Sequence, residues 1–193
     1  MANTALRRNL LERLIGGGIV LAVCLWIAGC GTLSADRAGL GADARLVLHQ
    51  SLRVAPKSVL VTIQGGLPVE SDYLLWYEPF CQFRLKTSSP DGQSIDPASF
   101  AITGIRRRQA SAALTLALAG PKVRVAGPAT LAMFENYTDY VTELDLRSQA
   151  QPDVTALICH DIAETAGRFL DLAQIQQILG LVATLEGVSV PSR

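Results

Sequence analysis

Cysteine and histidine are the side chains of this 193-residue chain best suited to covalent or metal chemistry, and the sequence contains four cysteines and two histidines. No two cysteines have the Cys-x-x-Cys spacing of a redox motif or a zinc site. His160 is followed by Asp161, but neighbours on a strand point to opposite faces, so these two do not form a hydrogen-bonded dyad by themselves. The sequence also lacks a glycine-rich phosphate loop, a Gly-x-Ser-x-Gly elbow and a His-Glu-x-x-His motif. We therefore predict a protein that is not an enzyme and needs no cofactor or metal; a catalytic site assembled from distant residues is the alternative.

The N-terminus has the layout of an export signal. Three arginines, Arg7, Arg8 and Arg13, precede an apolar stretch over residues 19–27 that is too short to serve as a permanent membrane span. Small residues and a cysteine close the stretch, in the order Ile27-Ala28-Gly29-Cys30. This layout predicts a signal peptide over residues 1–29.

The sequence Ile27-Ala28-Gly29-Cys30 resembles the lipobox of bacterial lipoproteins, in which one aliphatic and two small residues precede an invariant cysteine. The resemblance implies that the Cys30 thiol is acylated, that residues 1–29 are removed, and that the lipid anchors the protein to a membrane. Because Gly31 rather than aspartate follows the cysteine, the resemblance also implies the outer membrane. We expect the protein to lie on the periplasmic face of that membrane. A plain secretory signal and an N-terminal membrane helix that happens to contain a cysteine are the alternatives.

The chain after the signal peptide has a slight acidic excess. Without Arg7, Arg8, Arg13 and Glu12 it keeps 14 basic and 16 acidic residues, which argues against nucleic acid as a partner. Residues 30–43 are rich in small side chains and predict a lipidated N-terminus with a short tether. Residues 44–193 are long enough to form a single domain with its own core.

Two cysteines, Cys81 and Cys159, remain for the exported domain. An oxidising compartment favours one disulfide between them, whereas the spacing does not favour the alternatives of a redox-active pair or metal ligands. Cys81 shares its strand parity with Phe83 and Leu85, and Cys159 shares it with Leu157. We therefore expect both thiols to point into the same core from different strands, with Cα atoms within about 7 Å.

Alternating apolar and polar residues predict strands over much of the domain. Residues 45–54 and 59–63 predict a hairpin, and residues 140–146 predict a strand with one wet face. Residues 154–160 are apolar on both faces and predict a central strand. The period changes near the C-terminus, where Asp171 caps a predicted helix that ends at Gly180, followed by a short strand over 182–185. The predicted fold is mainly β: an antiparallel β sandwich or partly open barrel with one C-terminal helix.

Two stretches are candidate interaction surfaces. Tyr73, Trp76 and Tyr77 belong to the densest aromatic run, which predicts either a stacking or membrane-interface surface or a set of rings that fills the end of the core. Three consecutive arginines, Arg106, Arg107 and Arg108, predict either an anion-binding group or a charged strand end that suppresses edge pairing. Residues 110–133 predict an apolar two-stranded excursion that either packs on the sheet or protrudes.

Together these observations predict an outer-membrane lipoprotein that acts as a binding or structural module in the cell envelope. Its partners would be the membrane, through the lipid anchor, and another envelope protein. A carrier of a lipid or small apolar ligand is the second hypothesis, and a cell-wall hydrolase is the third. A closed apolar cavity would favour the carrier, whereas an exposed apolar strip would favour the interaction module.

Overall fold

The computed structural model describes residues 40–112 and 136–188, which all belong to one compact unit, Ala35–Arg193. The predictions for the signal peptide, Cys30 and residues 30–39 of the tether fall outside the described residues, as does most of the apolar excursion. The described elements, in chain order, are β1 (Leu40–Leu48), β2 (Leu52–Val54), β3 (Leu60–Gln64), β4 (Leu67–Val69), the 3-10 turn η1 (Ser71–Tyr73), β5 (Phe80–Leu85), β6 (Gln93–Ile95), β7 (Ser99–Ser111), β8 (Thr138–Arg147), β9 (Val154–Ala163), α3 (Leu172–Leu179) and β10 (Ala183–Val188).

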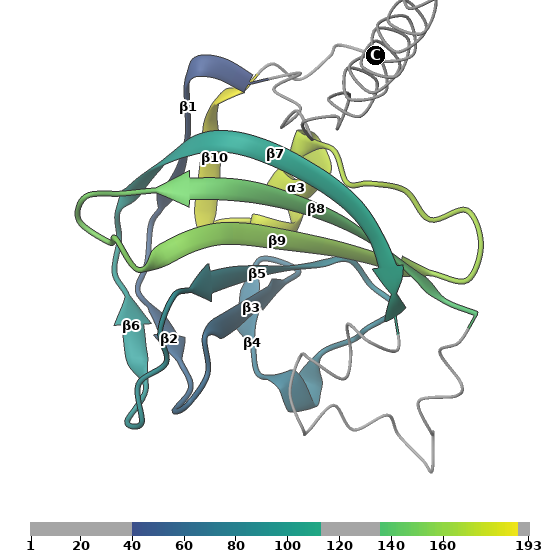
Figure 1. The fold of residues 1–193 in the computed structure, drawn as a ribbon, viewed down its shortest axis with the longest axis horizontal. Coiled ribbons are helices and arrows are strands. Elements are labelled where there is room, and N and C mark those ends of the chain that lie inside the picture. The colour runs from purple at the N-terminus through teal and green to yellow at the C-terminus, as the bar shows by residue number, and fades with distance from the viewer. Residues whose placement is uncertain (1–39, 113–135, 189–193) are drawn as a thin grey trace, which may run out of the picture. The chain divides into compact units, whose positions relative to one another are not determined.

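Eight of the strands form one antiparallel sheet that curls into a half-barrel (Figure 1). The strand order is β10-β1-β7-β8-β9-β5-β3-β4, and β2 and β6 pair separately as a two-stranded sheet. The prediction of a mainly β fold with one C-terminal helix is therefore confirmed, in its partly open barrel form. As predicted, β9 is a central strand, between β8 and β5.

The inner face of the half-barrel carries the main core. Alternate residues of the strands point inward and are joined by the apolar side of α3, so that Phe83, Phe100 and Leu157 are fully buried together with Ile175. Burying side chains of this size contributes about 1.5–3 kcal/mol each, which makes this face the main source of stability.

The helix α3 links the two edges of the sheet. Its end contacts the β3–β4 turn, where the Gly66 N–H donates to the Ile178 carbonyl oxygen (2.8 Å), and β10 follows it directly in the chain. The contact needs glycine, because a Cβ on Gly180 would lie 2.7 Å from the Gly66 Cα, and Gly180 has a φ of +54°.

The helix begins as the sequence predicts. The Asp171 side chain accepts from the Gln174 N–H (2.8 Å), and the Gln174 side chain accepts from the Asp171 N–H (3.1 Å), which completes a capping box. The predicted stripe of Leu172, Ile175, Ile178 and Leu179 is buried. Throughout residues 40–112 and 136–188, no helix combines the length and the apolar character needed to cross a membrane.

The predicted hairpin of residues 45–54 with 59–63 is wrong. The chain leaves the main sheet after Leu48, and β2 pairs with β6, whereas β3 pairs with β4 and β5. Leu48 and Leu52 keep the same parity and are both buried, although Gln50 between them is exposed at the bend. Periodicity reports which face a residue takes and not which strand lies beside it.

Candidate interaction surface

Residues 70–78, called the aromatic segment below, connect the edge strand β4 to β5. The segment contains two tight turns: the Tyr73 N–H donates to the Glu70 carbonyl oxygen (2.9 Å), and the Glu78 N–H donates to the Leu75 carbonyl oxygen (3.0 Å). Leu74, between the turns, is buried in a small cluster with Phe80. The segment is thus anchored on one side and turns its other side chains outward.

One buried side chain fixes the backbone of the aromatic segment. Gln64, on β3 and only 8% exposed, donates through Nε2 to the carbonyl oxygens of Leu75 (2.8 Å) and Glu78 (3.2 Å). Its Oε1 accepts from the Leu75 N–H (3.0 Å). The Gln64 amide therefore pairs with both backbone groups of Leu75, much as a neighbouring strand would. We call these three hydrogen bonds the Gln64 clamp.

Apolar side chains of this region lie in solvent. Tyr73 is 75% exposed, Leu75 is 42% exposed and Tyr77 is 59% exposed, and Leu67 on the neighbouring β4 is 66% exposed. These are four of the five large apolar side chains exposed among the described residues, so such exposure is concentrated between positions 67 and 77. An apolar surface that a domain holds in place without burying it is typical of an interaction site.

Trp76 joins this surface to the domain. The ring is half-buried and stands edge-on to the rings of Tyr77 and Tyr137, with centroids 5.7 and 5.4 Å away. Of the two interpretations of the aromatic run, filling the end of the core describes Leu74 and Phe80, whereas Tyr73 and Tyr77 belong to the surface.

The two edges of the eight-stranded sheet are protected against an added strand. In β4, Leu67 pairs with Gln64 next to the two-residue turn, so the next residue, Pro68, turns its nitrogen to the free side. Proline has no N–H to offer there. At the opposite edge, the Gln176 side chain accepts from the Leu185 N–H of β10 (2.7 Å) and donates to the Ala183 carbonyl oxygen (3.1 Å). These edges therefore offer few free backbone groups to an added strand, which favours recognition of a partner by side chains.

The three arginines are not brought together as one anion-binding group. They lie inside β7, where Arg106 and Arg108 are opposite Glu143 and Val141 of β8, and Arg107 is opposite Thr142. Neighbouring residues take opposite faces, so Arg107 points away from the other two.

The charge of Arg106 is already compensated. Its guanidinium donates to Glu143 (3.0 Å) and to Asp145 (2.5 Å), and the hydrogen bond to Asp145 raises the pKa of Arg106 above its ordinary value. From Gly104 onward, and within the part of the chain described, β7 pairs with β8 alone, which agrees with the interpretation that the arginines discourage edge pairing.

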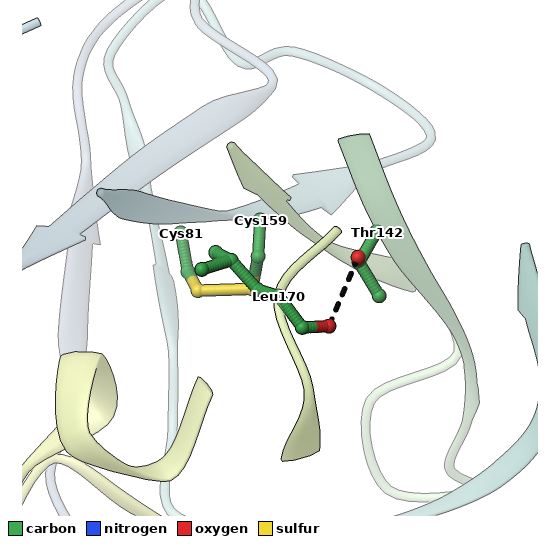
Figure 2. Close-up of a disulfide and its surroundings, with 4 residues drawn as sticks. All are labelled: Cys81, Thr142, Cys159 and Leu170. Carbon is green, nitrogen blue, oxygen red and sulfur yellow. Dashed lines mark hydrogen bonds between the residues drawn. A yellow bond between two sulfur atoms is a disulfide. The ribbon is translucent and has the colours of Figure 1, made fainter. Parts of the chain in front are cut away.

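The predicted disulfide between Cys81 and Cys159 is present, with an S–S distance of 2.11 Å (Figure 2). The two residues are directly opposite each other on β5 and β9, with Cα atoms 4.0 Å apart, and both are fully buried on the inner face. Figure 2 shows Leu170 beside the bond, where its carbonyl oxygen accepts from Thr142 Oγ1 (3.1 Å). The bond joins two adjacent strands 78 residues apart in sequence, so we assign it a structural role.

A buried polar pair on the outer face was not predicted. His160 Nδ1 lies 2.9 Å from Asp139 Oδ2, their side chains are 5% and 0% exposed, and the imidazole stacks on Phe80 with centroids 4.7 Å apart. Asp161 instead accepts from the Arg168 N–H (3.2 Å). The pair joins β8 to β9, so only the strand register brings it together.

The His160–Asp139 pair does not form a catalytic or metal site with other described residues. Among these residues, His160 Nε2 has no hydrogen-bond partner, and thus no hydroxyl or thiol nucleophile. No group of three or more His, Cys, Asp or Glu side chains in the same residues is placed to hold a metal ion.

Comparisons with protein-family models, curated proteins and solved structures gave no match for this chain. Its function therefore has to be inferred from its own residues. Among the predicted site residues, Tyr73, Trp76 and Tyr77 share one fixed segment, Cys81 and Cys159 are crosslinked, and the arginines serve no common site.

Proposed function

We propose that this protein is a lipid-anchored lipoprotein of the outer membrane, facing the periplasm, whose domain is a non-enzymatic binding module for another envelope protein. The lipobox-like sequence at Cys30 supports the anchor and the location. The Gln64 clamp is the observation that carries the binding role. The buried Gln64 side chain forms three hydrogen bonds with the backbone of the aromatic segment, whereas the tyrosines of that segment are exposed to solvent.

The clamp favours binding because it fixes the segment before a partner arrives. Fixing a flexible backbone costs about 1–2 kcal/mol for each residue, and a backbone that is already fixed avoids this cost on association. Tyrosine and tryptophan are also the residues that carry most binding energy at protein interfaces. Tyr73, Trp76 and Tyr77 combine both features within five residues.

The carrier hypothesis receives less support. A carrier needs space on the inner face, and in this domain core side chains from the strands and from α3 gather there. The exposed apolar strip anticipated for an interaction module is instead found at residues 67–77. The hydrolase hypothesis has no supporting group of residues within the described part of the chain.

Site-specific photo-crosslinking in the native host tests the proposal. A benzoylphenylalanine in place of Tyr77 is expected to capture a defined envelope protein that the same probe at Asp91, in the exposed β5–β6 turn, does not capture. Gln64→Ala should reduce this crosslink. Gln82→Ala, the matched control, removes a buried amide that binds only Thr62 Oγ1 (3.1 Å) and should leave it intact. Identical capture at Tyr77 and Asp91, or a crosslink insensitive to Gln64→Ala, would overturn the proposal.

A further inference from the structure

The aromatic segment is acidic as well as aromatic. Glu70, Asp72 and Glu78 are its charged residues, and no lysine, arginine or histidine occurs between Lys57 and Arg84. All three carboxylates are exposed, and none forms an ion pair with another described residue. The segment therefore presents three uncompensated negative charges.

Each exposed tyrosine shares a turn with a carboxylate. Glu70 and Tyr73 are joined by the hydrogen bond of η1, and Tyr77 directly precedes Glu78 in the turn that Leu75 closes. An aromatic face attracts a cation, and a neighbouring carboxylate pairs with the same cation. Two such combinations occur within nine residues.

The charge excludes the membrane as the natural occupant of this surface. Bacterial lipid surfaces are anionic and attract basic segments. Three carboxylates that came within a Debye length of such a surface, about 8 Å at physiological salt, would be repelled by it. Pro68 removes the backbone donor from the free side of β4, which favours an occupant that is recognised by its side chains.

We propose that the aromatic segment binds an arginine-bearing segment of its partner protein, with guanidinium groups over the rings of Tyr73 and Tyr77 and in contact with Glu70 and Glu78. This inference rests on the proposed function and names the chemistry of the partner. Guanidinium suits such a site because it stacks on aromatic rings and forks onto carboxylates.

Isothermal titration of the full-length protein in dodecyl maltoside with the peptide acetyl-Arg-Leu-Arg-Leu-Arg-amide tests the inference. The peptide should bind, more weakly in 300 mM salt than in 50 mM salt, and acetyl-Glu-Leu-Glu-Leu-Glu-amide should not. Tyr77→Leu keeps an apolar side chain but removes the ring, and should raise Kd roughly twofold to fivefold, whereas Tyr77→Phe should not.

The carboxylates are tested in the same assay. The double variant Glu70→Gln/Glu78→Gln should raise Kd roughly threefold to tenfold, because two exposed ion pairs are lost. Asp91→Asn removes an exposed carboxylate from another loop and should leave Kd unchanged. Circular dichroism melting of each variant confirms that the domain is folded.

The outcomes separate this inference from the proposed function. Equal binding of both peptides, no binding of the arginine peptide, or no effect of Tyr77→Leu and of the double variant would each overturn the arginine assignment. If the Tyr77 crosslink in cells still depends on Gln64, the binding module stands and its partner has a different chemistry. If the probes at Tyr77 and Asp91 capture the same proteins, or if Gln64→Ala leaves the Tyr77 crosslink unchanged, the proposed function itself is wrong.

Discussion

Breaking the disulfide should destabilise the domain by several kcal/mol. Cys81 and Cys159 are separated by 78 positions, and the chain-entropy model gives about 4.5 kcal/mol at 25 °C for closing a loop of this length in the unfolded state. Both residues are fully buried, so Cys81→Ala/Cys159→Ala is the suitable perturbation because it places no hydroxyl in the core. The small loss of side-chain volume adds to the effect of the lost crosslink.

Urea unfolding followed by circular dichroism measures the effect. The double variant should lose about 5 kcal/mol of unfolding free energy, and its melting temperature should fall by on the order of 10 °C. Reductant present throughout unfolding should destabilise the native protein by a similar amount and leave the double variant unchanged. A difference below about 1 kcal/mol would refute the entropic reasoning. Quantitative thiol labelling of the untreated native protein would refute the bond itself.

Three further predictions concern the anchor, the clamp and the helix end. Cys30→Ser should leave the full-length protein unacylated by mass spectrometry and free in the soluble fraction at high salt, whereas the native protein should sediment with outer membranes on a density gradient; membrane retention of the variant would contradict lipid anchoring. Gln64→Ala should abolish hydrogen-exchange protection of the Leu75 amide and cost about 2 kcal/mol, since three hydrogen bonds are lost, and unchanged protection would show that the clamp is not needed. Gly180→Ala should cost more than Gly65→Ala in urea unfolding, because both have a positive φ but only at Gly180 would the new Cβ collide, 2.7 Å from the Gly66 Cα; equal costs would locate the penalty in φ alone.

Features set by local chemistry could be predicted from the sequence. The helix start at Asp171, its buried stripe and its end at Gly180 follow from side chains within one or two turns of each other. The inward parity of Cys81 and Cys159 was equally local, and it sufficed for the disulfide because both residues face one core.

Features set by strand register could not be predicted. His160 meets Asp139 only because β8 lies beside β9 in one particular alignment, and a polar residue in either strand carries no sign of its partner. The Gln64 clamp was missed for a related reason. Gln64 ends a regular alternation, and nothing in that pattern shows that the segment between β4 and β5 returns to it.

The protected sheet edges and the fixed aromatic segment point to the same mode of recognition. A curled sheet that left both edges open would bind any extended chain through backbone groups, with little selectivity. Here Pro68 removes the backbone donor at one edge. At the other edge the Gln176 side chain forms hydrogen bonds with the Leu185 N–H and the Ala183 carbonyl oxygen. What the domain offers at the β4 edge is a set of side chains on a backbone that Gln64 holds in place. Selectivity then depends on ring faces and carboxylates, so single substitutions at Tyr77 or Glu78 should change binding without changing the fold.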